Sequence, residues 1–313
     1  ALGCIADGCP QIVGYLDELY PMLLTWASHA RPLIRKIALW CMSRYSEWLI
    51  RVSSKSAAEA QRYLAPVVQC FCARMCDHTK TVQGSAVSAL GVLAQEANEQ
   101  GRGDLLAGMA QPVLQCCAQC LGTYQEINMV ILCDTLATVL EACKHRTDIV
   151  RHPDFLNMIM PPLIARWNAV DAAAPPGSGG GDPHQFKPLL EGLTSVAVAV
   201  GPAFEPFAPP VFKKCLDIIE TTLIVMLSGH DGMGGGVNDP MEMGDYIDFD
   251  PMCVALDLIA GIAEGVGASC EAMLRASNLL DLLMHCLGYE HTDVQQSAFG
   301  VLGEVGKACP GYI

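Results

Sequence analysis

Apolar residues recur along this chain at spacings of three and four, the pattern of a helix with one buried side. The clearest case is the stretch 129–143, in which five residues fall on one side of a helix: Met129, Leu132, Leu136, Val139 and Cys143. Asp134 and Glu141 fall on the opposite side. With the first apolar residue as position x, the buried positions are x, x+3, x+7, x+10 and x+14, and the outward carboxylates are x+5 and x+12.

This pattern returns along the chain. Two stretches repeat it in full: Phe186, Leu189, Leu193, Val196 and Val200, with Glu191 at x+5, and Met252, Ala255, Ile259, Ile262 and Val266, with Asp257 and Glu264. Three weaker copies place these residues in the core: Ala38, Met42, Tyr45 and Leu49; Ala86, Leu90, Leu93 and Ala97; and Phe299 and Leu302, with Glu304 at x+12. Such internal repetition predicts a stack of similar helices.

Helical stretches pair along the chain, separated by short breaker segments that force neighbouring helices to run antiparallel. The expected pairs are 10–26 with 31–50, 57–76 with 81–97, 104–121 with 125–143, 154–167 with 185–200, 209–227 with 250–266, and 271–287 with 294–308. Hairpins of roughly 40 to 47 residues have the period of HEAT repeats. The sequence therefore predicts an all-α HEAT-repeat superhelical solenoid of antiparallel helical hairpins. It would be a single domain over 1–313, with a half repeat at 1–9 and then about six hairpins.

Two inserts interrupt the expected hairpins. Residues 170–184 are rich in Pro, Gly and Ser, which predicts a flexible segment. Residues 229–248 are rich in Gly and Met and carry Asp231, Asp239, Glu242, Asp245 and Asp248 without Lys or Arg. This second insert is either a solvated acidic loop or a low-affinity contact for a basic ligand.

Composition narrows the classes of function. The formal net charge of −14 disfavours nucleic acid and anionic membranes as partners and favours basic ones. We expect no run as long as the 18 or so apolar residues of a membrane span. Because the chain starts within a helical pattern and without Met, we interpret it as part of a longer protein.

Cysteine spacing and the known catalytic motifs give no sign of an enzyme or of a cofactor. The 16 cysteines are scattered through apolar helical stretches, as expected of packed thiols in a reducing compartment. The single CxxC, Cys117 to Cys120, lacks a second pair at zinc spacing, so packed thiols are favoured over a metal site. We expect no catalytic residues, no metal and no cofactor.

Trp40 and the outward carboxylates are the candidate binding residues. Trp40 lies opposite its buried stripe and beside Ile37, whereas Trp26, Trp48 and Trp167 are expected in the core. Carboxylates at the same two offsets in stacked hairpins would line one surface. Those offsets lack Lys and Arg, so the carboxylates have no obvious partner within their own row, and Arg44, one turn from Trp40, is the nearest exception. An apolar anchor beside an acidic row suits an extended peptide with basic residues and an aromatic or apolar one.

Several stretches resemble a known family: LGCIADGC, IRKIALWCMSRYSEW, MIMPPLIARWN, VALDLIAGIAEGVG and RASNLL are similar to HEAT repeats of the transportin, or karyopherin-β2, class of nuclear import receptors. The resemblance implies cargo proteins with basic proline-tyrosine nuclear localisation signals as partners, bound by the inner helices. It also implies release by Ran-GTP, contact with nucleoporins through the full-length protein, and shuttling between cytoplasm and nucleus.

By matching motifs, Ile37 and Trp40 correspond to the family's apolar site for the proline-tyrosine end of the signal. The acidic contacts for its basic part correspond to Asp134, Glu141, Glu191, Asp257, Glu264 and Glu304. One position departs from the family: Gln95 stands where a cargo-binding acid is expected, with Glu96 beside it. The alternative function is a HEAT-repeat scaffold subunit of a multiprotein assembly.

Overall fold

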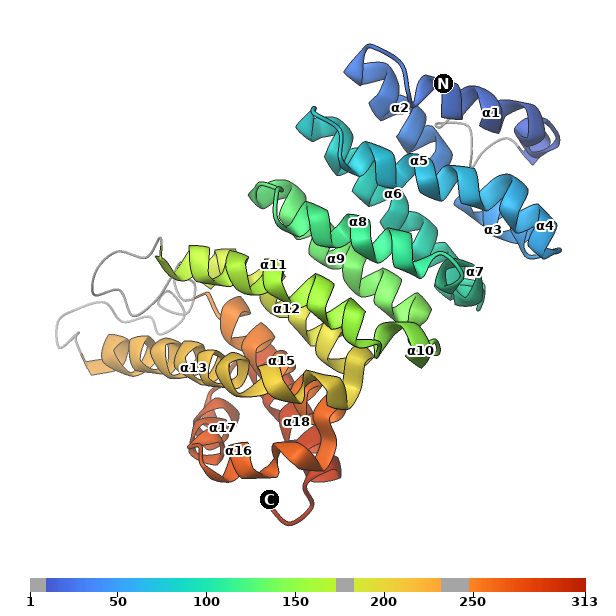
Figure 1. Cartoon of the computed structure of the whole chain (residues 1–313). Coiled ribbons are helices and arrows are strands. Elements are labelled where there is room, and N and C mark those ends of the chain that lie inside the picture. The colour runs from blue at the N-terminus through green and yellow to red at the C-terminus, as the bar shows by residue number, and fades with distance from the viewer. Residues whose placement is uncertain (1–9, 173–182, 232–247) are drawn as a thin grey trace. The chain divides into compact units, whose positions relative to one another are not determined.

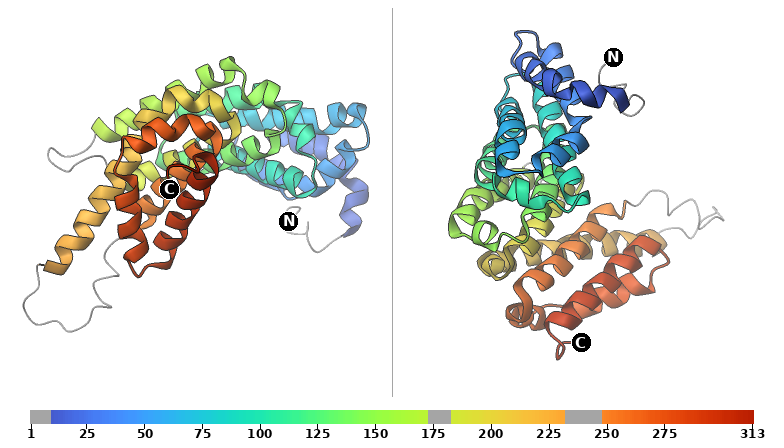
Figure 2. Two further views of the ribbon diagram at one scale, coloured as in Figure 1. Left: turned by 90° about the horizontal axis from the view of Figure 1, so that it is seen from below. Right: turned by 90° about the vertical axis from the view of Figure 1, so that its right-hand side faces the viewer.

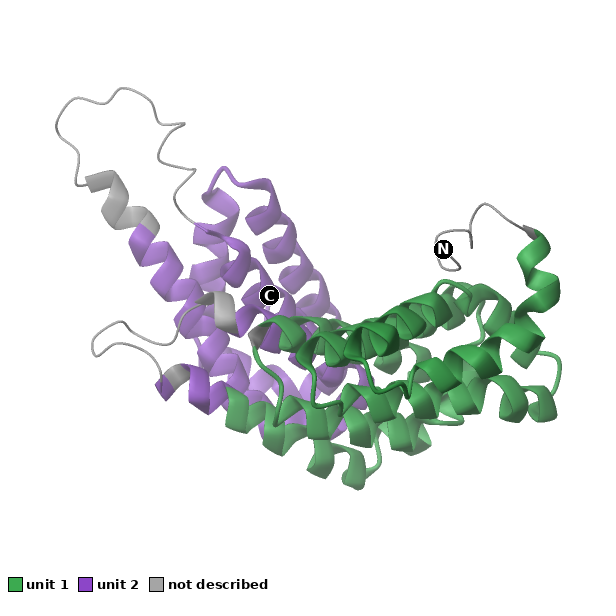
Figure 3. Cartoon of the chain, turned by 90° about the horizontal axis from the view of Figure 1, so that it is seen from above, with its two compact units in different colours: residues 1–166 green, residues 167–313 purple. Residues whose placement is uncertain are grey.

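The computed structural model of the chain describes residues 10–172, 183–231 and 248–313, and every regular element in these ranges is helical (Figure 1). The prediction of an all-α fold is therefore confirmed for the described residues. The chain divides into two compact units, unit 1 with residues 1–166 and unit 2 with residues 167–313 (Figure 3). The half repeat expected at 1–9 and most of the two inserts, 173–182 and 232–247, lie outside the described residues.

Unit 1 is a stack of helical hairpins. Its helices are α1 (Leu16–Trp26), α2 (Pro32–Ser43), α3 (Ser46–Ser53), α4 (Ala57–Glu59), α5 (Ala65–Met75), α6 (Lys80–Glu99), α7 (Gly103–Ala107), α8 (Ala110–Leu121), α9 (Glu126–Cys143), α10 (Thr147–Val150) and the first part of α11 (Pro153–Ala172). A 3₁₀ turn, Pro10–Tyr15, precedes α1, and a π-helical turn, Ala60–Leu64, joins α4 to α5. Figures 1 and 2 show α5 and α8 in one layer and α2, α6 and α9 in the other.

The helix expected over 31–50 is broken between α2 and α3. The buried Tyr20 fills the break, since its hydroxyl donates to the carbonyl oxygens of Met42 at 3.2 Å and Tyr45 at 3.3 Å. Its ring stacks on Trp48 with centroids 5.2 Å apart. Both carbonyl oxygens also accept backbone N–H bonds, from Tyr45 and Leu49, so the Tyr20 hydroxyl adds a second donor to each and fixes α1 against the break.

A buried ion pair joins the first two hairpins of unit 1. Arg35 on α2 donates to Asp77 at 2.8 Å, and only 3% and 1% of the two side chains are exposed. The backbone N–H of Thr79 also donates to Asp77, at 2.9 Å. Although burial alone would raise the pKa of the Asp77 carboxyl, these hydrogen bonds and the Arg35 charge hold it below its usual value.

Unit 2 contains α12 (Pro183–Val200), α13 (Ala208–Asp231), α15 (Asp250–Val266), α16 (Glu271–Arg275), α17 (Leu279–Gly288) and α18 (Thr292–Ala308), with 3₁₀ turns at Gly201–Phe207 and Gly267–Cys270. Helix α15 packs against α12, α13 and α18. The approach of α15 to α12 needs glycine, because a Cβ on Gly265 would lie 2.2 Å from the Ala197 carbonyl oxygen. Gly267, with φ of 66°, ends α15 in the left-handed region that favours glycine.

Five of the six apolar stripes predicted within the described residues are confirmed, since all their members are at most 5% exposed. They belong to α2 with the start of α3, and to α6, α9, α12 and α15. The stripe predicted for α18 is wrong: Phe299 is 62% exposed and Leu302 is only half-buried. The buried stripe of α18 is instead Val294, Ala298, Val301 and Val305. A shift of one residue turns each side chain by about 100° around the helix axis, so Gly303 takes the outward position assigned to Glu304.

The expectation that no run reaches membrane-spanning length also needs correction. Residues 250–275 are long and apolar enough, with a mean hydropathy of 1.6 in the most apolar window. Within unit 2, however, 56% of that window is buried, and α15 lies against α12, α13 and α18. The apolar residues of this run are therefore used in helix packing.

Among the tryptophans expected in the core, Trp26 is 38% exposed, which contradicts the prediction. Trp48 and Trp167 are half-buried, and Trp167 meets the ring of Phe186 edge-on at 5.3 Å.

Candidate functional site

The second helix of each hairpin carries the predicted binding residues. In unit 1 these helices are α2, α6 and α9, which pack on one another in sequence order. In unit 2 they are α12, α15 and α18, with the same order of packing. We call each set the second-helix row of its unit. The predicted residues of unit 1 are Ile37, Trp40, Asp134 and Glu141, and those of unit 2 are Glu191, Asp257, Glu264 and Glu304.

Trp40 opens onto a cavity in the second-helix row of unit 1. Its side chain is 42% exposed, which confirms the prediction that it faces away from the buried stripe, and Ile37 is 49% exposed one turn earlier. A cavity of about 300 Å³ lies between α2, α6 and α9. Its lining residues are Lys36, Trp40, Ser43, Thr81, Gly84, Ser85, Ser88, Ala89 and Ile131. Ile37 is not among them, so its exposed side chain lies outside the cavity wall. We call Ile37 and Trp40 together the Trp40 surface.

Asp134 stands next to this cavity. Ile131 lines the cavity from α9, and Asp134 follows it by three residues, which is about one helical turn along the same face. The Asp134 side chain is exposed, and within residues 10–172 no hydrogen bond or ion pair of its carboxylate is found. The structure thus places an exposed indole in the cavity wall and an exposed carboxylate about one helical turn beyond its α9 side.

Lys36 adds a positive charge that the sequence analysis did not anticipate. It lines the Trp40 cavity from α2, four residues before the tryptophan. A second, larger cavity of about 600 Å³ lies at the start of α6 and α9 and shares Thr81 with the first. Its lining residues are Lys80, Thr81, Gln125, Ile127, Asn128 and Arg166. The second-helix row of unit 1 is therefore not uniformly acidic, because cations gather toward the start of its helices.

Glu141 is exposed as predicted but has a partner. It forms an ion pair with Lys144, three residues on, a partner that stands outside the two carboxylate offsets and was not predicted. Because 56% of the Glu141 side chain is exposed, solvent screens this pair and a ligand cation can compete for the carboxylate.

Gln95 occupies the position of the missing acid on α6. Its amide donates to the carboxylate of Glu99 at 2.9 Å, and Glu96 instead accepts from Gln100 at 2.7 Å. Glu99 is exposed and lies one turn beyond Gln95, so it brings a negative charge to this part of the row. The contact between Gln95 and Glu99 could have been predicted from the sequence, because residues four apart on a helix are neighbours.

In unit 2, Asp257 and Glu264 are exposed on α15, seven residues and therefore two turns apart. Partial burial raises the pKa of the Asp257 carboxyl, and a hydrogen bond with Ser297 opposes the shift. Glu191 on α12 is exposed beside Lys187. Lys187 is ion-paired with Asp250, and this hydrogen bond raises the pKa of its ammonium group.

Glu304 differs from the other predicted carboxylates. Its side chain is 27% exposed, and it accepts from Lys307 at 2.6 Å. The hydrogen bond to Glu304, together with the charges of Glu304 and Glu264, raises the pKa of Lys307. Glu304, which stands one position after the outward position of α18, is thus held in a local ion pair with Lys307, and the Lys307 charge also interacts with Glu264.

No family model matches the chain. Among curated relatives, mouse (Mus musculus) transportin-1 is 33% identical over 309 residues, which cover 98% of this chain and 31% of the relative. The importin subunit beta-2 of Schizosaccharomyces pombe is 30% identical over 312 residues, covering 99% of this chain and 31% of the relative. The chain thus spans about a third of the length of these relatives.

Solved structures match the helical repeat fold. Importin beta in an ammonium sulfate condition aligns with a TM-score of 0.56 and 16% identity over 100% of this chain and 34% of that one. A designed armadillo repeat protein in complex with peptide (KR)4 aligns with a TM-score of 0.54 and 12% identity over 91% and 98%. The prediction of a HEAT-type solenoid is confirmed by these matches. Over nearly its whole length the chain is thus a homologue of transportin-1 and importin subunit beta-2, and it corresponds to about a third of their length.

Proposed function

We propose that this chain is the cargo-binding part of a nuclear import receptor, and that its second-helix rows bind an extended basic peptide of the proline-tyrosine type. The observation that carries the proposal is the Trp40 cavity with Asp134 one turn away, in a chain homologous to transportin. An exposed indole gives a large apolar contact, and an exposed carboxylate gives a cation contact next to it.

The charges around the cavity give the peptide a direction. Lys36 in the cavity wall repels arginine and lysine but suits a tyrosine hydroxyl, a backbone carbonyl or a carboxylate. Asp134 lies on the α9 side of the cavity, where a cation is favoured. The aromatic end of the peptide would therefore contact Trp40 and Ile37, and its basic residues would extend toward Asp134 and Glu141.

In unit 2, Glu191, Asp257 and Glu264 would bind further basic residues of the signal. Glu304 is the weakest candidate there, because a ligand cation would have to displace Lys307 from it. Such separated anchors suit a ligand that is disordered when free and ordered when bound.

The other partners come from the resemblance to the whole family. Release of cargo by Ran-GTP, contact with nucleoporins and shuttling between cytoplasm and nucleus would be properties of the full-length protein, of which this chain corresponds to about a third. The alternative function, a repeat scaffold for folded subunits, predicts no affinity for a free basic peptide.

A titration with synthetic peptides tests the proposal. The probe is a peptide with an arginine-rich segment followed by Pro-Tyr, and its two controls replace either the arginines by glutamine or Pro-Tyr by Ala-Ala. We expect the parent peptide to bind, each control to bind more weakly, and the two peptides that keep the arginines to lose affinity steeply as salt is raised. Equal affinity for all three peptides would reject the proposal, and binding of none of them would favour a scaffold.

A further inference from the structure

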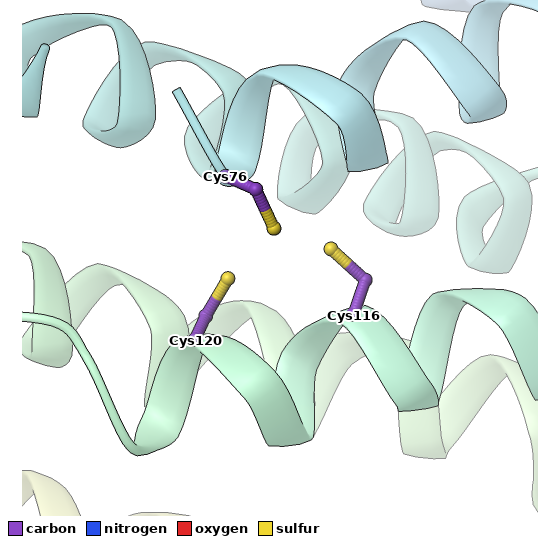
Figure 4. Close-up of side chains that lie close together, drawn as sticks. All are labelled: Cys76, Cys116 and Cys120. Carbon is purple, nitrogen blue, oxygen red and sulfur yellow. The ribbon is translucent and has the colours of Figure 1, made fainter. Parts of the chain in front are cut away.

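Three cysteine thiols meet between two successive hairpins of unit 1. Cys76 lies at the end of α5, and Cys116 and Cys120 lie on α8, with their sulfur atoms all within 4.8 Å of one another (Figure 4). In the sequence, the CxxC from Cys117 to Cys120 was the candidate metal site. On a helix, however, residues four apart share a face, and the structure pairs Cys116 with Cys120 while Cys117 is buried elsewhere.

We propose that Cys76, Cys116 and Cys120 bind one soft metal ion, Zn²⁺ or Cu⁺, which links α5 to α8. The ligand atoms are all sulfur. Thiolates and thioethers prefer these ions over hard cations such as Mg²⁺ or Ca²⁺, which require oxygen ligands. The proposal does not depend on the proposed function of the second-helix row.

Further sulfur donors surround the three thiols. The thioether sulfur of Met75 lies 4.0 Å from the Cys116 sulfur, and Cys72, one turn before Cys76, places its carbonyl oxygen 3.3 Å from that sulfur. Three thiolates with one weaker fourth donor suit Cu⁺, and three thiolates with water or the Cys72 thiol complete a tetrahedral zinc site. The trio thus supplies three of the ligands that either ion needs, and the fourth would come from a neighbouring sulfur or from solvent.

The geometry requires only a small contraction. Zinc–sulfur bonds of about 2.3 Å in a tetrahedral site place the sulfur atoms about 3.8 Å apart. The three sulfur atoms already lie within 4.8 Å of one another, so side-chain rotations that bring the sulfur atoms about 1 Å closer together suffice. Cys76 is exposed and follows the last residue of α5, where it can make this adjustment without disturbing the core.

Metal binding here is a proton exchange and needs no oxidant. Binding replaces three S–H bonds by three metal–sulfur bonds and releases three protons to solvent. The Tyr124 hydroxyl and the Cys120 thiol both donate to the Met75 carbonyl oxygen, at 2.7 Å and 3.8 Å, so the Cys120 proton lost on metal binding comes from this hydrogen bond.

A bound ion would tie the second hairpin of unit 1 to the third through their first helices. Without an ion, these helices meet through apolar packing, the thiol hydrogen bonds of Cys116 and Cys120 to carbonyl oxygens of α5, and the Tyr124 hydrogen bond to Met75. The expected consequence is a stiffer α5–α8 pair, measurable as slower amide hydrogen exchange in both helices when the ion is present.

The test is a competition titration of the reduced chain, with Zn²⁺ against a chromophoric zinc chelator and Cu⁺ against a chromophoric copper chelator. We expect one ion of at least one type to bind per chain, and binding to weaken more than about tenfold in both Cys76→Ser and Cys120→Ser. Cys70→Ser is the matched control, because this half-buried thiol also lies on α5 but outside the trio, and it should leave the affinity unchanged.

Thermal unfolding with and without the ion guards against misfolded variants. Cys76 is exposed, so Cys76→Ser should keep the melting temperature of the metal-free chain but lose the rise that the ion gives the parent. Replacement by Co²⁺ should give a thiolate-to-cobalt absorption band that Cys76→Ser abolishes. Absence of binding in the folded parent, or binding that neither Cys76→Ser nor Cys120→Ser weakens, would overturn the proposal.

Discussion

Unit 1 is held together by buried polar side chains, whereas in unit 2 the ion pair of Lys187 on α12 with Asp250 on α15 is exposed and these two helices approach each other backbone to backbone. In unit 1, the Arg35–Asp77 ion pair joins the first two hairpins, and the buried Thr135 hydroxyl on α9 donates to the Val87 carbonyl oxygen on α6 at 3.2 Å. In unit 2, Gly265 lets α15 approach the backbone of α12. Glycines also allow close approach in unit 1, where a Cβ on Gly91 would lie 2.8 Å from the Thr135 hydroxyl oxygen, so the two units differ chiefly in the buried ion pair of unit 1.

This difference also separates the two binding surfaces. Unit 1 combines an exposed indole, a cavity and the carboxylate of Asp134. Unit 2 offers carboxylates on α12 and α15, near lysines that already have acidic partners. Unit 1 is thus suited to anchoring an apolar side chain, and unit 2 to adding charge contacts.

The largest expected effect is loss of the buried ion pair in unit 1. Asp77→Asn leaves the Arg35 charge buried without its partner, which costs about 3 to 5 kcal/mol of unfolding free energy. Denaturant unfolding measures this cost. The matched control is Asp104→Asn, whose ion pair with Arg102 is exposed and should contribute less than about 1 kcal/mol. Equal effects of the two changes would contradict the charge-dependent contact.

Next in size is a steric change in unit 2. Gly265→Ala places a Cβ against the Ala197 carbonyl oxygen, and the forced separation of α15 from α12 should destabilise the chain by about 1 to 3 kcal/mol. Gly303→Ala on α18 is the control, because no atom lies within 4 Å of its added Cβ. That control should stabilise the chain slightly, since alanine favours a helix by up to about 1 kcal/mol over glycine. A neutral Gly265→Ala would remove the close approach as an explanation.

A smaller effect should appear in the pH dependence. The pKa of Asp77 is lowered in the folded chain, so its contribution to stability is present at neutral pH and is lost as pH falls below about 4. The pKa of Asp257 is raised, so its contribution has the opposite sign and is lost as pH rises through the raised value. Asp257→Asn should therefore stabilise the chain slightly at neutral pH and have no effect in acid. Thermal unfolding at pH values from acid to neutral measures both contributions to stability. If both residues changed the stability in the same direction as pH rises, the opposite pKa shifts would be contradicted.

The smallest expected effect concerns Glu141. Because Lys144 already pairs with this exposed carboxylate, Glu141→Gln should weaken a basic peptide by less than about 1 kcal/mol, whereas Asp134→Asn should weaken it more. Peptide titrations at low and high salt measure the difference. If Glu141→Gln had the larger effect, the cavity would not determine where the basic residues bind.

Much of the fold could be predicted from the sequence, because a buried stripe at spacings of three and four is a property of each helix by itself. The prediction fails for α18, where Phe299 and Val301 offer competing stripes and only packing against α15 selects between them. Trp40 was predicted outward correctly, since it lies opposite its own stripe.

What the sequence could not give are contacts made between hairpins. The Lys36 charge in the Trp40 cavity depends on how α2 meets α6 and α9, and the approach of Cys76 to Cys116 and Cys120 depends on how α5 meets α8. The pairing of Glu141 with Lys144 is different, because residues three apart on a helix are neighbours and the pair was visible in the sequence.

The central claim is that the Trp40 surface of unit 1 anchors the apolar end of a basic peptide. It is tested most directly by measuring the affinity of the Pro-Tyr peptide for Trp40→Ala and for Trp26→Ala, a second exposed tryptophan that does not line the cavity. The account predicts a loss of about 1 to 4 kcal/mol for Trp40→Ala and none for Trp26→Ala. Unchanged affinity in Trp40→Ala, with the variant folded, would contradict it.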